Sequence, residues 1–378
     1  MAVNGNHPEE PVVVTPDAID LMIASLADQG RSVLGPVRKD GAVVYEDIRT
    51  TDDLPRGWVD EQAGGHYRLK RKGEAYFGVT LGPTSWKRFL HPPKQMIWSA
   101  RAEGGETTID AAPIKGEEYA FIGARACELA AIEVQDKVFL EGPYVDPHYA
   151  ARRAALFIVA VNCGRAADTC FCTSMDTGPK VRGGYDIALS EIATGANAAF
   201  LADAGSEKGA ALLATLPSRA ATRSDLDASE AATANAVSQI SRRIDTDGLS
   251  ALLKASHDHP RWDNVASRCL NCSNCTMVCP TCFCTNVEEV SDLEGVETSR
   301  VQSWASCFTS DFSHVHGGSV RATPKARYRQ WMNHKLSTWF DQFDMSGCTG
   351  CGRCISWCPV GIDITEEATA IRGKTKGG

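Results

Sequence analysis

Two cysteine-rich runs constrain the fold of this chain more than any other feature. Residues 269–280 read CLNCSNCTMVCP and residues 348–359 read CTGCGRCISWCP, so the spacing C-x2-C-x2-C-x3-C-P occurs twice. Three thiolates two residues apart let one tight loop wrap a cubane iron–sulfur cluster and direct backbone N–H groups at the sulfurs. The following proline ends the helix of the loop and turns the fourth cysteine away.

The fourth cysteine of each run predicts how the two runs are joined. In proteins with two such clusters, it binds the cluster of the other run. We therefore expect two [4Fe-4S] clusters, one on Cys269, Cys272, Cys275 and Cys358, and one on Cys348, Cys351, Cys354 and Cys279. Shared ligation would hold the runs side by side although about 70 residues separate them. Two zinc sites are the alternative, but zinc sites usually pair two C-x2-C units.

The first 225 residues contain four more cysteines, which are Cys127, Cys163, Cys170 and Cys172. Cys127 follows the apolar segment YAFIG at the start of a helical stretch, where the helix dipole and free N–H groups favour a thiolate. Cys163 follows the apolar run LFIVAV, and ligands collect at strand ends in α/β folds. We therefore predict a third iron–sulfur site; plain packing of buried thiols and a zinc site are the alternatives.

The pentapeptide TCFCT occurs twice, at residues 169–173 and 281–285. The first copy belongs to the predicted third site, whereas the second follows a run that is already complete. Three cysteines then remain without a site, which are Cys282, Cys284 and Cys307. Because three thiols do not complete a four-cysteine site, we expect them to pack as small apolar groups. The alternatives are weak hydrogen bonds that tune a cluster and a metal site completed by a histidine of the segment HVH (314–316).

Strand and helix patterns are mixed in the first 225 residues, which predicts an α/β domain with a mixed sheet. The runs Ser32–Arg38 and Ala42–Ile48 flank Lys39-Asp40-Gly41, which is a hairpin signal. We expect further strands at Tyr67–Leu69, Ala75–Leu81, Tyr119–Ile122, Leu156–Val161, Ile187–Leu189 and Ala198–Leu201, and helices at 16–28, Glu128–Lys137 and Gly209–Thr215.

The remainder of the chain divides into a connector and a second domain. Residues 226–258 are rich in alanine and polar residues at helical spacing, which predicts a helical connector. In residues 259–378, strand signals almost vanish while cysteines crowd together. We therefore expect a mainly α-helical dicluster ferredoxin-like domain organised around its ligands.

Charge and hydropathy exclude several classes of partner. The formal net charge of −8 and the lack of a long basic stripe argue against nucleic acid. The longest apolar run, Ala154–Val161, is too short to cross a membrane, and the first twenty residues lack a secretory signal, so we expect a cytoplasmic protein. One basic segment, Arg321–Arg329 followed by His334 and Lys335, is interpreted as a solvated helix face, with a docking surface as the alternative.

Several catalytic signatures are missing from the sequence. There is no second set of cysteine pairs for nickel, no G-x-G-x-x-G turn after a strand, no phosphate loop, and no identifiable nucleophile–base pair. We therefore expect no catalytic site in this chain and interpret it as a conductor of electrons.

Longer stretches of sequence resemble a known family. VCPTCFC (278–284), SWASC (303–307), RYRQWMNHK (327–335), GARACELAAIEVQDKVF (123–139) and NCGRAADTCFCTSMDTGP (162–179) are similar to the iron–sulfur beta subunit of soluble NAD(P)-linked nickel–iron hydrogenases, also called sulfhydrogenases. The related iron–sulfur subunit of anaerobic sulfite reductase carries similar motifs. The resemblance covers nearly the whole chain.

The resemblance implies an electron-transfer subunit of a cytoplasmic hydrogenase complex. Its partners would be the hydrogenase large and small subunits and a flavin- and NAD(P)-binding subunit, and it would pass single electrons between them. Three alternatives remain open. They are the equivalent subunit of anaerobic sulfite reductase, an iron–sulfur subunit of another dehydrogenase complex, and a scaffold whose clusters are purely structural.

Overall fold

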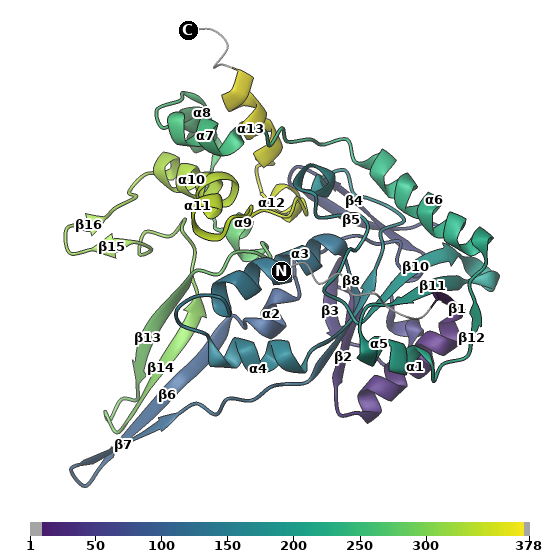
Figure 1. The fold of residues 1–378 in the computed structure, drawn as a ribbon. Helices are drawn as coiled ribbons and strands as arrows, with labels where there is room; N and C mark the ends of the chain where they lie inside the picture. Colours follow the sequence, from purple (N-terminus) through teal and green to yellow (C-terminus); the bar gives the residue numbers. More distant parts are fainter. Residues whose placement is uncertain (1–9, 374–378) are drawn as a thin grey trace.

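The computed structural model describes residues 10–373, and an eight-stranded mixed sheet is the largest sheet of this part of the chain (Figure 1). Its strands are β1 (Val12–Val14), β2 (Ser32–Lys39), β3 (Ala42–Asp47), β8 (Tyr119–Ala124), β9 (Phe157–Val161), β10 (Ile187–Ala193), β11 (Ala199–Ala204) and β12 (Ser218–Ala220). They lie in the order β12-β1-β11-β10-β9-β8-β2-β3, with parallel pairing from β10 through β9 and β8 to β2. The mixed α/β architecture predicted for the first half is confirmed.

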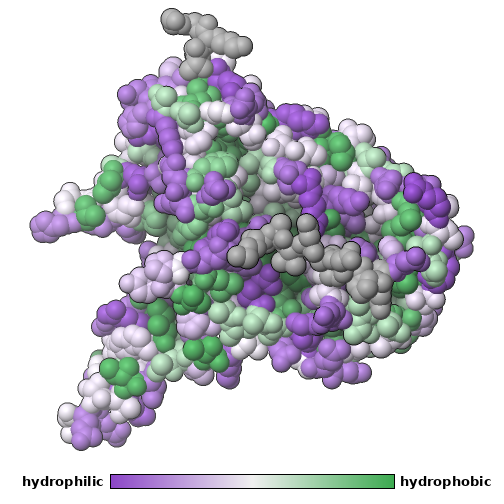
Figure 2. Space-filling view, in the orientation of Figure 1, coloured by the Kyte–Doolittle hydropathy of each residue, from purple (hydrophilic) through white to green (hydrophobic). Residues whose placement is uncertain are grey.

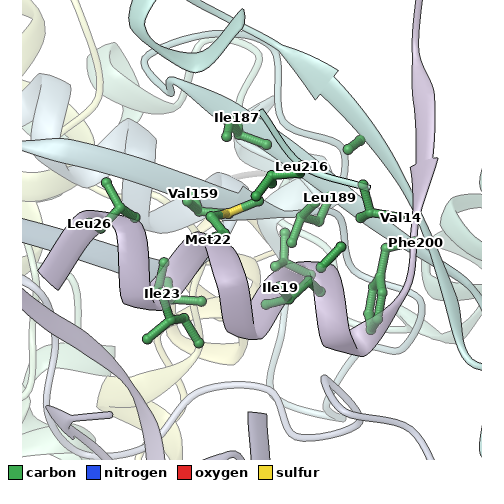
Figure 3. Close-up of a cluster of buried hydrophobic side chains, with 14 of the residues drawn as sticks. Val14, Ile19, Met22, Ile23, Leu26, Val159, Ile187, Leu189, Phe200 and Leu216 are labelled. Atoms are coloured by element: carbon green, nitrogen blue, oxygen red, sulfur yellow. The ribbon is translucent and has the colours of Figure 1, made fainter. Parts of the chain in front are cut away.

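Helices cover both faces of this sheet because its central strands are apolar on both sides. The apolar side chains of α1 (Pro16–Asp28) recur at helical spacing and pack against one face; Figure 3 shows Ile19, Met22, Ile23 and Leu26 beside Val159, Ile187, Leu189 and Phe200. Alternate strand residues such as Phe121 and Ile158 point to the other face and pack with α3 (Ala126–Phe139) and α4 (Pro147–Ala155).

The predicted hairpin is present as β2 and β3, which pair from Leu34 opposite Asp47 to Lys39 opposite Ala42. Its two turn residues, Asp40 and Gly41, have φ angles of 50° and 77°. Positive φ at both central positions is the geometry that matches the twist of a two-residue hairpin.

The strand predicted at Ala75–Leu81 is wrong, although the segment is largely buried. Its backbone groups bind side chains instead of a neighbouring strand. The Glu191 carboxylate accepts from the N–H groups of Tyr76 and Phe77 at 2.9 and 3.1 Å, and Arg125 donates to two carbonyls of the segment at 2.9 and 2.8 Å. Apolar content predicted burial correctly here, but it does not reveal which groups satisfy the backbone.

A second sheet adds strands to the second half of the chain, so the expectation of a mainly helical second domain is not confirmed. Two long strands of the second half, β13 (Thr285–Ser291) and β14 (Glu297–Trp304), form an antiparallel sheet with β6 (Lys94–Glu103) and β7 (Glu106–Ala111) in the order β13-β14-β6-β7. This sheet projects from the molecule as an arm (Figure 1). Most of its side chains are exposed or half-buried, so its strands lack the apolar runs that would predict them.

The helices of the second half surround a separate core. Their bounds are α7 (Leu249–Ala255), α8 (Arg261–Arg268), α9 (Asn274–Met277), α10 (Pro324–Asn333), α11 (Trp339–Phe343), α12 (Arg353–Ser356) and α13 (Ile364–Gly373), with a π-helical turn at His334–Thr338. Buried aromatic residues, among them Trp262, Tyr328 and Trp331, pack there against five of the motif cysteines and Cys307. This core therefore forms around the cysteine motifs.

The remaining elements are α2 (Lys87–Leu90), α5 (Glu207–Leu213), α6 (Arg223–Gln239), β4 (Trp58–Ala63), β5 (His66–Arg71), β15 (His314–Val315), β16 (Gly318–Ser319) and three short 3-10 turns at Thr51–Asp53, Cys172–Met175 and Gly195–Asn197. Helix α6 overlaps the predicted helical connector and packs on β10. No helix in residues 10–373 is long and apolar enough to cross a membrane. Residues 1–9, which belong to the segment expected to lack a secretory signal, lie outside the described residues.

Candidate iron–sulfur sites

The first cysteine run forms a tight loop between α8 and α9. Asn271 and Ser273 have φ angles of 51° and 66°, which bend the chain between Cys269 and Cys275. A small cavity at this loop is lined by cysteines of both runs, which are Cys269, Cys272, Cys275, Cys358 and Cys354. The first four of these are the set expected for one cluster, and the structure brings them together.

The thiols around this cavity also interact electrostatically. Burial raises the pKa of the Cys275 thiol well above its ordinary value. Four neighbouring thiols raise this pKa further, namely those of Cys307, Cys269, Cys358 and Cys272. The N–H group of Ile362 donates to the Cys358 sulfur at 3.3 Å. This is the kind of backbone N–H to sulfur contact that the loop spacing predicts.

The second run folds into a loop that ends in α12. Gly350 and Gly352 have φ angles of 63° and 76°, and a Cβ atom on Gly352 would lie 2.3 Å from the Thr169 carbonyl oxygen. Glycine at 352 therefore permits both the bend and the close approach of another chain segment. The N–H group of Gly350 points at the Cys348 sulfur at 3.5 Å.

The cysteines expected for the second cluster lie near one another as well. Burial raises the pKa of the Cys354 thiol well above its ordinary value, and the thiols that add to this effect are Cys348, Cys351, Cys279 and Cys275. Three of them, Cys348, Cys351 and Cys279, make up the expected second set together with Cys354. The fourth, Cys275, belongs to the other expected set, so the two groups of thiols adjoin.

Cys279 is buried, but polar groups surround its sulfur. The Lys335 ammonium group donates to its sulfur at 3.0 Å, and the Thr281 hydroxyl lies 3.1 Å from the same sulfur. The hydrogen bond from the Cys282 thiol and the positive charge of Lys335 hold the pKa of Cys279 well below its ordinary value. Cys279 is therefore poised as a thiolate, which is the form that binds iron.

The four cysteines of the first half come together from three elements. Cys127 begins α3 directly after β8, Cys163 follows β9, and the pair Cys170 and Cys172 lies on the loop before Met175. Burial raises the pKa of the Cys127 thiol well above its ordinary value, with further contributions from the thiols of Cys351, Cys172 and Cys163. The four thiols of the expected set lie near one another, and Cys351 of the second run packs against Cys127, Cys170 and Cys172.

Both TCFCT loops contact the second cysteine run. On one side, the Phe171 N–H group donates to the Gly350 carbonyl at 2.9 Å, and the hydroxyls of Thr169 and Ser356 lie 2.9 Å apart. On the other side, the Thr281 hydroxyl donates to the carbonyl of Gly347 at 2.7 Å. The two identical pentapeptides therefore flank the same loop, which the sequence did not indicate.

The donor sets suit cubane clusters chemically. Among residues 10–373, no three cysteine, histidine or carboxylate side chains stand close enough together to hold a metal ion as they are, at the two runs or elsewhere. Each expected set nevertheless consists of four thiols that influence one another electrostatically, and all of them except the exposed Cys272 are at least partly buried. Bound iron favours the thiolate form that burial alone disfavours, so these sets fit iron–sulfur clusters.

Sequence reasoning missed two buried cations at the second run. The interpretation of Lys335 as part of a solvated helix face is wrong, because the side chain is 5% exposed and its ammonium group contacts Cys279. Arg353, 1% exposed, donates to the Glu128 carboxylate at 2.5 Å and to the Gly82 carbonyl at 2.9 Å. Arg353 lies inside the second cysteine run, which was an available signal, whereas Lys335 lies outside both runs.

Comparison with known families bears directly on the two cysteine runs. Residues 268–362 match the family described as a 4Fe-4S dicluster domain. This segment is therefore similar to a 4Fe-4S dicluster domain. The domain spans both cysteine runs, and it includes the two strands β13 and β14 of the projecting sheet.

A relative matches over nearly the whole chain. The sulfhydrogenase 2 subunit beta of Pyrococcus furiosus is 29% identical over 350 residues, which cover 92% of this chain and 94% of that protein. The predicted resemblance to hydrogenase beta subunits is confirmed. No solved structure matches the chain.

Proposed function

We infer that this chain is the iron–sulfur electron-transfer subunit of a cytoplasmic, NAD(P)-linked nickel–iron hydrogenase complex. Its partners would be the hydrogenase large and small subunits and a flavin- and NAD(P)-binding subunit. The whole-length similarity to a sulfhydrogenase beta subunit supports this assignment. The exposed apolar side chains of the projecting sheet, some of them visible as green patches in Figure 2, support contact with another chain.

The cofactors we propose are two [4Fe-4S] clusters in the second half and a third iron–sulfur cluster in the first. Cys269, Cys272, Cys275 and Cys358 would hold the first cluster, and Cys348, Cys351, Cys354 and Cys279 the second. Cys127, Cys163, Cys170 and Cys172 would hold the third. In this arrangement residues 1–225 form an α/β domain, 226–258 a helical connector and 259–378 the dicluster domain.

The adjacency of the three cysteine sets is the observation that carries the proposal. Cys351 of the second set interacts with Cys127, and Cys354 of the same set interacts with Cys275. The second set therefore lies between the other two. Bound clusters would supply one-electron reduction and oxidation. In space, the second cluster would lie between the third and the first.

The residues of the chain would prepare these sites in three ways. Apolar packing around the thiols excludes water, and backbone N–H groups at Ile362 and Gly350 point at sulfurs. The buried ammonium group of Lys335 offsets negative charge at Cys279. The N–H groups and the ammonium group favour the reduced state of a cluster, whose negative charge is larger.

Isolation of the native complex through an affinity tag on this chain tests the assignment. We expect a nickel-containing chain to co-purify, and hydrogen gas to reduce the iron–sulfur centres of the complex in the absence of any other reductant. A complex that contains sirohaem and no nickel would contradict the hydrogenase assignment and identify the sulfite reductase alternative. Iron content that is unaffected by Cys170→Ser would contradict the third cluster.

A further inference from the structure

The three cysteines that were expected only to pack share one cavity. Cys282, Cys284 and Cys307 line a partly enclosed cavity of about 80 Å³, whereas the cavity at the first cysteine run measures about 30 Å³. The β13–β14 hairpin explains how they meet. Thr285 pairs with Trp304 at its base, and the Ala305 N–H group donates to the Cys284 carbonyl at 2.8 Å, so the cysteines on either side of the hairpin lie together.

Two buried lysines adjoin the same thiols. Lys87 and Lys335 are each 5% exposed, and both interact electrostatically with Cys282 and Cys284. Lys87 donates to the Cys282 carbonyl at 2.9 Å, and Lys335 donates to the Cys279 sulfur at 3.0 Å. Within the described residues, neither ammonium group forms an ion pair with a carboxylate.

Buried cations need a counter-charge, because an unpaired ammonium group costs several kcal/mol in a protein interior. Thiols lie near both ammonium groups, although Lys87 also lies over the Trp304 ring, 3.7 Å from its centroid, and Lys335 also donates to the Thr281 hydroxyl at 3.0 Å. Of these thiols, the proposed second cluster uses Cys279 alone. A further negative charge next to Cys282 and Cys284 would balance the second lysine. A metal–thiolate group has that charge.

A fourth donor faces the cavity from a distorted part of a helix. The helical hydrogen bonding of α10 changes to a π-helical turn at His334–Thr338, and both His334 and Lys335 line the cavity. Among the described residues that line this cavity, His334 is the one histidine. Histidine replaces cysteine as a ligand in some iron–sulfur centres. Such π-helical turns occur frequently at functional sites.

We propose that Cys282, Cys284 and Cys307 bind a further iron–sulfur cluster of the [4Fe-4S] type, with His334 at its fourth position. The two TCFCT loops would then do the same work, because each would supply a C-x-C pair to a cluster on one side of the second cysteine run. The proposal rests on the proposed function, since it adds a site to the same relay.

The position of the site favours iron over zinc. Cys307 interacts with Cys275 of the first set, and Cys282 forms a hydrogen bond with Cys279 of the second. A cluster here would accept one electron from a neighbouring cluster and pass the same electron on, whereas zinc has no redox chemistry.

Iron and acid-labile sulfide analysis of the intact, anaerobically purified chain tests the proposal. We expect about sixteen irons and about sixteen sulfides per wild-type chain, four for each of four clusters. The double variant Cys284→Ala/Cys307→Ala should lose about four irons and about four sulfides. It should keep the iron of the third cluster, which Cys170→Ser removes. Ser310→Ala, an exposed change three residues from Cys307, should lose none.

The possible outcomes separate the two proposals. A wild-type content of about twelve irons of which Cys170→Ser loses about four, or stoichiometric zinc that is lost with Cys284 and Cys307, would overturn the further site and leave the electron-transfer function intact. A wild-type chain without iron would overturn both. The wild-type count together with the iron content of Cys170→Ser decides the question even if the double variant does not fold.

Discussion

At the scale of single residues, close packing at the second cysteine run depends on glycine. Gly352 has a positive φ angle, and its Cα faces the Thr169 carbonyl so closely that a methyl group has no room. The first TCFCT loop is held against the run by this contact. Because residue 352 has no side chain, the first half of the molecule can pack closely against the second cysteine run.

We predict that Gly352→Ala destabilises the protein by about 2–4 kcal/mol, because it adds left-handed backbone strain to an overpacked contact. Anaerobic denaturant unfolding would measure this loss. Gly317→Ala is the matched control, since a Cβ there meets no atom within 4 Å, and it should change stability little. Equal stability of the two variants would show that the contact at Thr169 is loose.

Lys335 allows a prediction about electron affinity. Replacing it by methionine removes a buried positive charge beside the Cys279 sulfur. The reduction potential of the second cluster should fall by on the order of 100 mV, from Coulomb's law at an effective dielectric constant of about 20. Redox titration followed by EPR would measure the shift, and Lys335→Arg should largely restore the potential. An unchanged potential in Lys335→Met would rule out this role for the charge.

At the scale of elements, a buried ion pair joins α3 to α12. Glu128, 1% exposed, accepts from the Arg353 guanidinium at 2.5 Å, from the Tyr45 hydroxyl at 2.9 Å and from the Trp86 indole at 3.1 Å. These bonds satisfy a carboxylate that would otherwise be costly to bury. They also fix α12, which carries Cys354 of the second set.

We expect Glu128→Gln to cost roughly 3–5 kcal/mol in unfolding free energy, because Arg353 is left buried without its counter-charge. Thermal or denaturant unfolding under anaerobic conditions would measure the effect. Glu133→Gln, an exposed change on the same helix, is the control and should stay near wild type. A loss below about 1 kcal/mol would mean that another group neutralises Arg353.

The projecting four-stranded sheet leads to a prediction about assembly. Leu293 at its tip is fully exposed, and Ile109 on β7 is 66% exposed. Leu293→Glu combined with Ile109→Glu should reduce recovery of partner chains at least about tenfold, as expected for interface positions. Leu21→Glu, an exposed apolar position on α1, should have no effect. Unchanged recovery of partners with the double variant would exclude this sheet as the contact surface.

The elements that sequence predicts well are those with a local cause. The β2–β3 hairpin follows from Asp40-Gly41, and α1 follows from its apolar spacing. The strands β13 and β14 were missed because their side chains are mostly exposed and polar, and the pairing of β14 with β6 joins segments nearly 200 residues apart. Such pairing has no local signature.

At the scale of the whole molecule, spacing predicted groups of cysteines but not how the groups adjoin. The run C-x2-C-x2-C-x3-C-P identifies its ligands because the chemistry is contained in one loop. The contact of Cys351 with Cys127, and the shared cavity of Cys284 and Cys307, depend on tertiary packing between distant segments. The three-dimensional arrangement thus changes a set of separate motifs into a continuous series of thiol groups.

A redox titration of the anaerobically purified chain, monitored by EPR, tests most directly whether this series conducts electrons. We predict that [4Fe-4S] signals appear within the range of about −700 to +450 mV and are broadened by magnetic interaction between neighbouring clusters. Iron-loaded protein that develops no such signal at any potential in this range would contradict the electron-transfer function and favour clusters with a purely structural role.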